Sequence, residues 1–590
     1  MSKDFEESAQ SRSSHSRVAS RLSQYLVAPS VTGVGEREFT DRLRGFSCIE
    51  MVHTIAPIGM LSPPVAVVRA DAKTAAGLAS ELGGSAVVEP DELLLAAALA
   101  NTAEAARYAI AVPASEAGFT VEIRVAGNMG EPVADATVQL IGRSFTAQAL
   151  TGRDGKATLT LAGEAAGCVA ELRVEPRVGY WGSRIVEPEL RPGGENVVAL
   201  RAIDNQAGRG WAERAMCFDR LPRQCRGSGA RIAVIDTGVE KAHLQLEALS
   251  HGSTGVDGKS AAWSSDASGH GTFCAGIIAA RENAETGFFG YAPDAEMHVF
   301  RLPDVPRSSD LLAALTYCIE SEIDVAFLGY GCRHGSLIVE QCLDAAKQHG
   351  VALVAAAGNT GGPVQFPASS RHVLAVAGLG YEGSPADTVQ TDDLAISVGP
   401  GSGYYVPGFS CKGYELDLCA PAVGIVSCQA PNAYAVRAGT SLAAAHVAAL
   451  AALVVAHHQD FRTDFAARNG ARVERLFQIL KASARPLSDV ALTGAGLPDA
   501  AAALGLVPEL TARDGLEEML HAMRCAGLYP RREIGAGYSS RRAPARGAAD
   551  VAQWPLRPPL MPEGQPHPIR DANLRDLAEA LRAAGLEGRI

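Results

Sequence analysis

The chain has 590 residues, which at roughly 100–200 residues per domain predicts about three to five domains. Hydrophobic residues make up 47% and charged residues 20%, a balance that excludes a mostly disordered or fibrous protein. The formal net charge of −12 argues against a nonspecific nucleic-acid-binding protein. No apolar run reaches the roughly 18 residues that span a bilayer, and the longest, residues 442–456, predicts a buried core helix.

The amino-terminal sequence and the cysteines bear on location. The stretch MSKDFEESAQSRSSHSRVAS has no apolar segment typical of a secretory signal. The 12 cysteines include no C-x-x-C pair, which argues against a zinc ribbon and a compact disulfide framework. We therefore expect a cytoplasmic protein with reduced thiols and no membrane span, and export by an unconventional route is the alternative.

Residues 1–46 are rich in Ser, Arg and Glu and predict a flexible segment, with a short helix at Arg21–Ala28 as its one structured candidate. Residues 47–97 predict a small α+β unit. Its elements are a strand, a helix with Asp71 as N-cap, and a second strand: Pro64–Ala70, Asp71–Gly83 and Ser85–Val88.

Residues 118–202 change to the alternating pattern of antiparallel strands. The runs FTVEIRVAG, ATVQLIG and ATLTLAG each place apolar residues at every second position. Asp154-Gly155 between two of these runs is a strong hairpin signal. The pattern predicts a small β-sandwich.

Residues 206–505 alternate short apolar strands with helical stretches. This α/β pattern predicts a mostly parallel sheet with helices on both faces. Residues 506–590 predict a helical region in which two similar amphipathic stretches, starting at Asp514 and Ala572, flank a proline-rich linker. The similarity is either an internal repeat or chance. The two helices either pack on the domain of residues 206–505 or bind a partner.

Three segments each place a reactive side chain at the edge of a predicted element: IAVIDTGVE with Asp236, SGHGTFCAGIIAA with His270, and AGTSLAAAHVAAL with Ser441. Serine is a weak nucleophile unless a base accepts its proton. His270 would be that base, and Asp236 would orient and stabilise its ring. In a fourth segment, VAAAGNTG, the amide of Asn359 would donate to an oxyanion.

Each of these motifs is weak alone. Asp-Thr-Gly also occurs in aspartic proteases, which pair two such loops, but this chain has only one. In the order Asp, His, Asn, Ser the four motifs make residues 206–505 resemble the subtilisin-like serine proteases, the peptidase S8 family. The resemblance implies hydrolysis of peptide bonds through an acyl-enzyme. Two departures are Leu442, where the family usually has Met, and Ala445, where it usually has Pro.

The resemblance also implies substrate-binding residues. Gly329, Tyr330 and Gly331 would form one wall of the S1 and S4 pockets, and Ala356, Ala357 and Gly358 the other S1 wall. Gln365 matches a position at the base of S1, where a polar side chain argues against a wide apolar pocket. The alternative is that Gln365 faces solvent.

Residues 47–97 resemble the subtilase propeptide, the inhibitor I9-like fold, which implies inhibition of the chain's own protease. A generic scaffold is the alternative. The predicted sandwich resembles carboxypeptidase-regulatory-like or Ig-like modules, which are usually spacers or docking surfaces. It separates the propeptide-like unit from the protease, so residues 97–205 must leave with the propeptide or nothing leaves.

No cofactor and no metal ligand set are predicted. Subtilases often bind calcium, but Glu240 and Gln245 stand where the family often has Asp, so the sequence supports no clear calcium motif. Cys274 follows His270 by one helical turn and either lies beside the imidazole or is a small buried residue.

Together these patterns and the resemblance predict a cytoplasmic serine endopeptidase that cleaves peptides or proteins and is regulated or dedicated to a limited substrate set. Two alternatives remain. One is a pseudoprotease that binds peptides without cutting them, and the other is a degradative protease exported without a signal.

Overall fold

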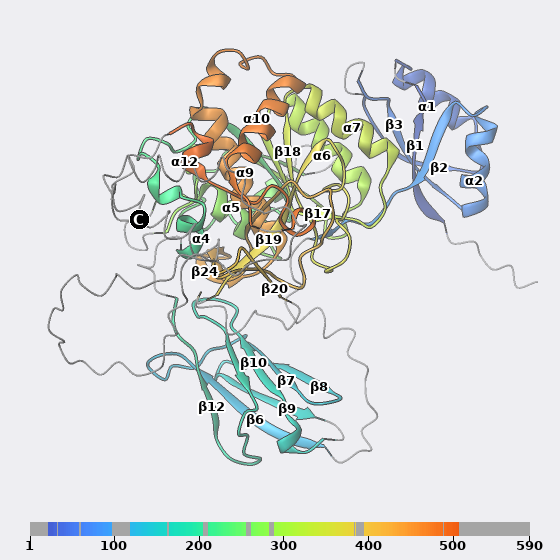
Figure 1. Ribbon diagram of the computed structural model, residues 1–590. Coiled ribbons are helices and arrows are strands. Elements are labelled where there is room, and N and C mark those ends of the chain that lie inside the picture. The colour runs from blue at the N-terminus through green and yellow to red at the C-terminus, as the bar shows by residue number, and fades with distance from the viewer. Residues whose placement is uncertain are drawn as a thin grey trace, which may run out of the picture. The chain divides into compact units, whose positions relative to one another are not determined.

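Figure 1 shows the computed structural model of the chain. The structure describes residues 22–506, except 32, 58–60, 97–117, 162–163, 204–209, 255–260, 283–287, 383, 385–394 and 488. The predicted C-terminal repeat helices and proline-rich linker therefore lie outside the described residues.

The N-terminal region (residues 22–96) forms a four-stranded antiparallel sheet in the order β2-β3-β1-β4. Its elements are β1 (Ser23–Pro29), α1 (Glu36–Arg44), β2 (Glu50–Ile55), β3 (Val65–Ala70), α2 (Ala72–Glu81) and β4 (Ala86–Pro90). The carboxylate of Asp71 accepts from Thr74 N at 2.9 Å, so the predicted N-cap forms.

The prediction of a flexible segment through residue 46 is wrong from Ser23 onward. β1 lies inside this sheet, between β3 and β4, and Val27 packs with Phe39 and Leu43 of α1. Where a short helix was predicted at residues 21–28, the chain forms a strand from Ser23 onward. The apolar run from Tyr25 to Ala28 was too short to indicate its state, because its pairing partners lie far along the chain.

The middle region (residues 118–203) consists of two sheets with the orders β11-β10-β7-β8 and β12-β6-β9. Their strands are β6 (Phe119–Ala126), β7 (Thr137–Ile141), β8 (Thr146–Leu150), β9 (Lys156–Leu161), β10 (Glu171–Glu175), β11 (Ser183–Val186) and β12 (Asn196–Ala199). One apolar core joins both sheets, with Ile123 and Leu159 from one and Leu140 and Leu172 from the other. Gly155, at φ 75°, makes the turn between β8 and β9.

The catalytic region (residues 210–506) is built on a nine-stranded, mostly parallel sheet in the order β14-β15-β13-β16-β18-β19-β21-β20, with β22 also paired to β19. The strands are β13 (Arg231–Asp236), β14 (His251–Thr254), β15 (Glu296–Arg301), β16 (Val325–Leu328), β18 (Ala352–Ala356), β19 (Val373–Tyr381), β20 (Ile396–Val398), β21 (Tyr404–Val406) and β22 (Leu418–Pro421). β16 and β18 are buried along their whole length, as expected for a parallel sheet covered on both faces.

The long helices of this region are α5 (His270–Ala279), α6 (Ser308–Glu320), α7 (Leu337–Gln348), α9 (Thr440–His457) and α10 (Gly470–Ala482). Smaller elements are α4 (Gly210–Ala215), β17 (Tyr330–Gly331), the hairpin β23 (Ile425–Gln429) and β24 (Ala433–Arg437), β25 (Ala484–Arg485), α11 (Val490–Thr493), β26 (Leu497–Pro498) and α12 (Ala500–Ala503). The prediction of a mostly parallel sheet with flanking helices is confirmed.

Helix α9 forms the centre of the catalytic region. Among the described residues it is the one helix long and apolar enough by composition to cross a membrane, and 89% of it is buried within the protein. It packs against α5 and against β16, β18, β19 and β22. The run at residues 442–456 is thus the buried core helix that the sequence predicted.

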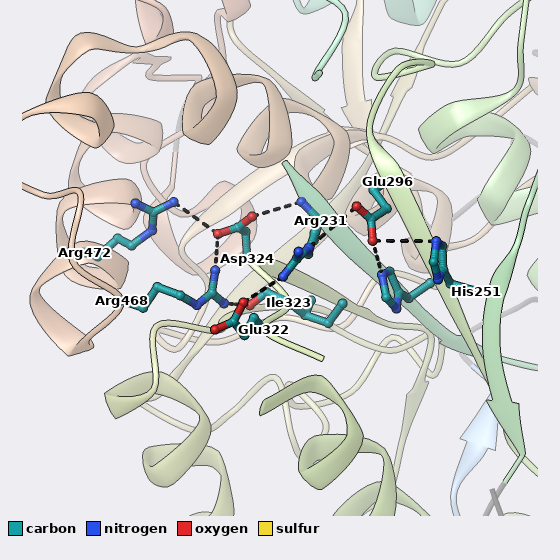
Figure 2. Close-up of polar contacts among 9 residues, drawn as sticks. Arg231, His251, Glu296, Glu322, Ile323, Asp324, Arg468 and Arg472 are labelled. Atoms are coloured by element: carbon teal, nitrogen blue, oxygen red, sulfur yellow. Dashed lines mark hydrogen bonds and ion pairs between the residues drawn. The ribbon is translucent and has the colours of Figure 1, made fainter. Parts of the chain in front are cut away.

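A buried carboxylate joins the amino ends of β13 and β16 to the start of α10 (Figure 2). Asp324 accepts from Arg231 N at 2.9 Å, from Arg468 Nη1 at 2.7 Å and from Arg472 Nη2 at 3.1 Å. Arg468 also donates to the carbonyl of Ile323. These contacts fix the helix to the amino edge of the sheet.

We expect Asp324→Asn to lower the free energy of unfolding by about 3 kcal/mol or more, because it leaves two largely buried guanidinium groups without their carboxylate. The matched control is Glu322→Gln. That carboxylate is 65% exposed where it pairs with Arg231, so its loss should cost no more than ~1 kcal/mol. Denaturant unfolding of both variants provides the measurement, and equal losses would contradict the anchoring role of Asp324.

Candidate active site

Three residues from three elements meet at the carboxyl end of the parallel sheet. Asp236 is the last residue of β13, His270 is the first of α5, and Ser441 is the second of α9. His270 Nδ1 lies 2.8 and 2.9 Å from the two Asp236 carboxylate oxygens, and His270 Nε2 lies 2.9 Å from Ser441 Oγ. All three side chains are buried. The structure thus brings together the predicted carboxylate, imidazole and hydroxyl.

Asp266 holds the loop after β13 against the start of α5. Its buried carboxylate accepts from Thr237 Oγ1 and Gly269 N, each at 2.8 Å, and from Thr272 N and Oγ1 at 2.8 and 2.7 Å. Thr237 Oγ1 in turn accepts from Gly271 N at 2.9 Å. Because the first N–H groups of a helix have no partner within it, Asp266 both caps α5 and positions it.

The electrostatics of His270 suit a general base. Burial opposes a charge on the ring, but the adjacent Asp236 carboxylate and the Cys274 thiol together outweigh burial and hold the pKa of His270 well above its ordinary value. Asp236 would therefore stabilise the imidazolium if His270 accepted the Ser441 proton. Its contact with Nδ1 also directs Nε2 toward the hydroxyl.

Asn359, three residues beyond the end of β18, presents a free donor. Its side-chain oxygen accepts from Thr440 N at 2.9 Å and from Thr440 Oγ1 at 2.8 Å, so its Nδ2 points away from Thr440. Nδ2 is buried and has no hydrogen-bond partner among the described residues. An unpaired buried donor is costly for a fold, and beside a nucleophile it is suited to stabilise an oxyanion.

The predicted substrate-binding strand passes close to the triad. A Cβ at Gly329 would lie 2.1 Å from Asp236 Oδ2, so this position must be glycine for the strand to pass the carboxylate. Tyr330 and Gly331 form β17. A Cβ at Gly331 would lie 3.0 Å from the carbonyl oxygen of Phe366.

Gln365 lies between the two predicted pocket walls. A Cβ at Gly358, whose φ is 110°, would lie 2.5 Å from Gln365 Oε1, and one at Gly331 would lie 3.6 Å from the same oxygen. Gln365 is only 9% exposed and its backbone N donates to Ala357 O at 2.9 Å. The alternative that Gln365 faces solvent is therefore excluded. Ala356 and Ala357 are buried at and just beyond the end of β18.

Comparison with known proteins decides the family. The profile of the Subtilase family matches residues 227–496. Subtilisin Savinase of Lederbergia lenta is 33% identical over 285 residues, which are 48% of this chain and 93% of the relative. Subtilisin DY of Bacillus licheniformis is 30% identical over 241 residues, 40% of this chain and 79% of the relative. The chain belongs to the subtilase family. The prediction of a subtilisin-like serine protease is thereby confirmed.

For some relatives, the alignment with this subtilase covers only about half of the relative's length. A thermophilic serine proteinase of Bacillus sp. strain AK1 is 38% identical over 232 residues, which are 38% of this chain and 52% of that protein. The profile match contains Asp236, His270, Asn359 and Ser441 but ends before residue 506 and begins after the middle region. Residues 22–203 therefore lie outside the family match.

The two departures from the family pattern lie inside helix α9 of this subtilase. Leu442 and Ala445 are both buried. The helix still begins at Thr440, directly before the nucleophile candidate, and continues without interruption to His457. Packing therefore accommodates both residues without displacing Ser441.

Sequence reasoning missed the residues that position the triad. Asp266 and Thr237 connect two loops, and Thr440 orients Asn359. Asp266 had a weak signal, because an acidic residue just before a predicted helix is typical of a helix start. Nothing in the sequence showed that its carboxylate also reaches Thr237 in the first loop.

Cys274 lies beside the imidazole. Its Sγ is 3.9 Å from His270 Nε2, and burial raises the pKa of the thiol. The thiol is therefore both near the triad and part of the core.

The two positions considered for calcium are engaged within the protein. Glu240 Oε1 accepts from Ala242 N at 3.1 Å, and the buried Gln245 donates to the carbonyl of Phe288 at 2.6 Å.

Asp236→Asn tests the pH behaviour of the site. Removing the carboxylate takes away the largest interaction that raises the pKa of His270 and leaves the stronger effect of burial, which lowers it. Activity requires neutral His270, so the acid limb of the pH–rate profile should move to lower pH while kcat falls by ~10⁴. Kinetics across pH provide the measurement. The exposed Asp219→Asn is the control, and an unmoved acid limb in Asp236→Asn would contradict the assignment.

Asn359→Ala removes the free amide donor. We expect kcat to fall by ~10²–10³, the cost known for such a donor in subtilisin, because the oxyanion exists only during reaction. KM should stay nearly constant. Asn359→Asp keeps the oxygen that accepts from Thr440 but lacks the N–H groups, and it should lose activity as well. Full activity in Asn359→Asp would show that the residue acts only through Thr440.

Proposed function

We propose that the chain is a serine endopeptidase in which Ser441 is the nucleophile, His270 the general base and then acid, and Asp236 the residue that orients His270. The proposal depends above all on one observation, the unbroken contact from carboxylate to imidazole to hydroxyl. Asn359 Nδ2 and the backbone N–H of Ser441, at the start of α9, would stabilise the oxyanion.

We further propose that substrates bind as an added strand along β17. Antiparallel pairing to an exposed strand gives affinity through the backbone, while pockets read alternate side chains. Gln365, between Gly331 and Gly358, would form the base of the S1 pocket. A buried amide there favours a P1 side chain that can hydrogen-bond with it.

The N-terminal region is proposed to inhibit the chain's own protease. Its last described strand, β5 (Leu95–Ala96), pairs antiparallel with β17, with Ala96 opposite Tyr330 and Leu95 opposite Gly331. Leu94 N also donates to Pro306 O at 2.8 Å. The segment thus lies where a substrate strand would pair, which supports competition for the same site.

Two carboxylates of the N-terminal region cap helices of the catalytic region. Glu89 accepts from Ser336 Oγ at 2.6 Å and from Leu337 N at 3.0 Å at the start of α7. Asp91 accepts from Ser309 N at 2.9 Å and from Ser309 Oγ at 2.8 Å at the start of α6. Negative charge is favourable at a helix N-terminus, so these contacts would hold β5 on β17.

The cytoplasmic location, the limited substrate set and release of the N-terminal region stay predictions. A propeptide is usually cut off directly before its protease domain. Here the middle region lies between the two interacting regions in sequence, so it must be released as well or nothing is released. A serine-reactive fluorophosphonate probe and intact-mass analysis address activity and release together.

We expect the probe to label the purified wild-type chain and not Ser441→Ala, because only Ser441 is activated. If the enzyme matures by itself, only the wild type will lose an N-terminal fragment. Absence of labelling, even after the N-terminal region has been removed by limited proteolysis, would favour the pseudoprotease. Unchanged mass with labelling would indicate an enzyme that works uncut.

Self-inhibition is tested in Ser441-intact chains with the double variant Glu89→Gln, Asp91→Asn. Losing both helix caps should weaken the docking of β5 and raise the initial rate of peptide hydrolysis by about tenfold or more. The control is Asp41→Asn, Glu81→Gln, which changes two exposed carboxylates of the same region. An equal rate in both double variants would contradict inhibition through these contacts.

A further inference from the structure

A second cluster of chemically active side chains lies at the amino edge of the sheet, away from the triad. His251 opens β14 and pairs directly with His298 of β15 in parallel register. Glu296 precedes His298 by two residues, so the two side chains lie on the same face of β15. The three residues therefore come together because of strand register and not because of a local sequence motif.

The three groups converge on one point. The rings of His251 and His298 are stacked, with centroids 4.6 Å apart and planes 15° apart. Glu296 Oε1 lies 2.9 Å from His298 Nε2 and 3.8 Å from His251 Nε2. Each imidazole thus directs its Nε2 atom toward Glu296 Oε1. Figure 2 shows this arrangement for Glu296 and His251.

These distances match the spacing of ligands around a small divalent ion. Ligands placed about 2.0–2.1 Å from zinc in a tetrahedron lie about 3.3 Å from one another. The two separations from Glu296 Oε1, 2.9 and 3.8 Å, fall on either side of this value. Two imidazoles with one carboxylate suit zinc and its transition-metal neighbours, whereas calcium prefers oxygen ligands alone.

Neighbouring groups orient the cluster as they do in metal sites. His298 is 8% exposed, and its Nδ1 lies 3.0 Å from Tyr317 Oη. A ring proton on Nδ1 would be donated to Tyr317, which leaves the Nε2 lone pair for a metal. Arg231 Nε lies 3.6 Å from Glu296 Oε2, so this carboxylate oxygen is in an ion pair. The other oxygen, Oε1, is left to bind a metal.

The cluster also has access and an open coordination position. His251 and Glu296 are 47% and 43% exposed and line a cavity of ≈ 740 Å³ together with Arg231, Asp324 and Arg468. Three protein ligands leave a fourth tetrahedral position for water from this cavity. The triad lies at the other end of β13, about 16 Å along the strand from Arg231, so metal bound here would not touch the reacting atoms.

We propose that His251, Glu296 and His298 form a zinc-binding site that clips the edge strand β14 to β15. On binding, the metal takes the Nε2 lone pairs of both histidines and Glu296 Oε1. The hydrogen bond between His298 Nε2 and Glu296 is replaced by two metal–ligand bonds, and the His298 proton resides on Nδ1. The site is independent of the proposed catalytic mechanism.

The active site offers a competing set of metal ligands, Asp236, His270 and Cys274. The two sites differ in chemistry because only the active site contains a thiol. Cobalt(II), which replaces zinc and absorbs visible light, therefore distinguishes them. Cobalt on Cys274 gives a near-ultraviolet thiolate charge-transfer band, and cobalt on nitrogen and oxygen ligands does not.

The experiment uses the full-length chain without a histidine tag, in a Ser441→Ala background that prevents self-cleavage. Zinc binding is measured by calorimetry and cobalt binding by absorption. We expect one zinc equivalent, an intense visible cobalt spectrum without the thiolate band, and a zinc-dependent rise in Tm.

Matched variants locate the site. His251→Ala changes an exposed side chain and should fold, yet it should weaken zinc binding at least about a hundredfold and remove the rise in Tm. Tyr317→Phe keeps the ring but loses the Nδ1 partner, and it should weaken binding by about tenfold. The control His334→Ala removes another exposed histidine near a carboxylate, Glu92, and should change nothing.

Three results would overturn the proposal. The first is no zinc binding at micromolar metal, and the second is equal affinity in His251→Ala and its parent. The third is a cobalt thiolate band that disappears in Cys274→Ala while His251→Ala retains full binding, which would assign the metal to the active site.

Discussion

The active site depends on a buried carboxylate that takes no part in the proposed chemistry. Asp236 and His270 are 34 residues apart and belong to different elements, yet their contact tolerates little displacement. Asp266 satisfies both sides at once, because it accepts hydrogen bonds from Thr237 in the first loop and from the unpaired N–H groups at the start of α5. The packing of α5 on α9 then sets the distance from His270 to Ser441. The helix cap is thus also the connection that forms the triad.

Parallel strands divide the chemistry of the catalytic region between two edges of one sheet. Because the strands run in one direction, residues that end them gather at one edge and residues that begin them gather at the other. Asp236 and Gly329 are on the carboxyl edge. Arg231, Glu296 and Asp324 begin or precede their strands and meet at the amino edge, where the charges are paired with one another (Figure 2). The separation exceeds the roughly 8–10 Å over which exposed charges act in physiological salt, so the charged amino edge has little influence on His270.

The N-terminal region uses the same physical device as the active site. Glu89 and Asp91 place carboxylates at the starts of α7 and α6, as Asp266 does at α5. The first N–H groups of α6 and α7 have no partner within their helices, so these acidic side chains of the N-terminal region can accept from them. β5 begins four residues after Asp91 and pairs with β17 through the backbone. The side chain of Leu95 is 57% exposed, so the pairing depends little on it, which supports the proposal that this segment takes the place of a substrate.

The sequence by itself determined the mostly parallel sheet, the buried helix after Ser441 and the identities of the four candidate catalytic residues. Apolar periodicity and short motifs are local properties, so they survive without knowledge of the fold. The sequence pattern gave a wrong prediction for β1, whose state depends on strands that follow it by tens of residues. It also did not show that Asp266 contacts Thr237 as well as capping α5. Only the tertiary structure decided that Gln365 lies between Gly331 and Gly358, that β5 pairs with β17, and that His251 pairs with His298. Each of these depends on strand register or loop packing between distant segments, where the contact energy comes from partners that no local pattern contains.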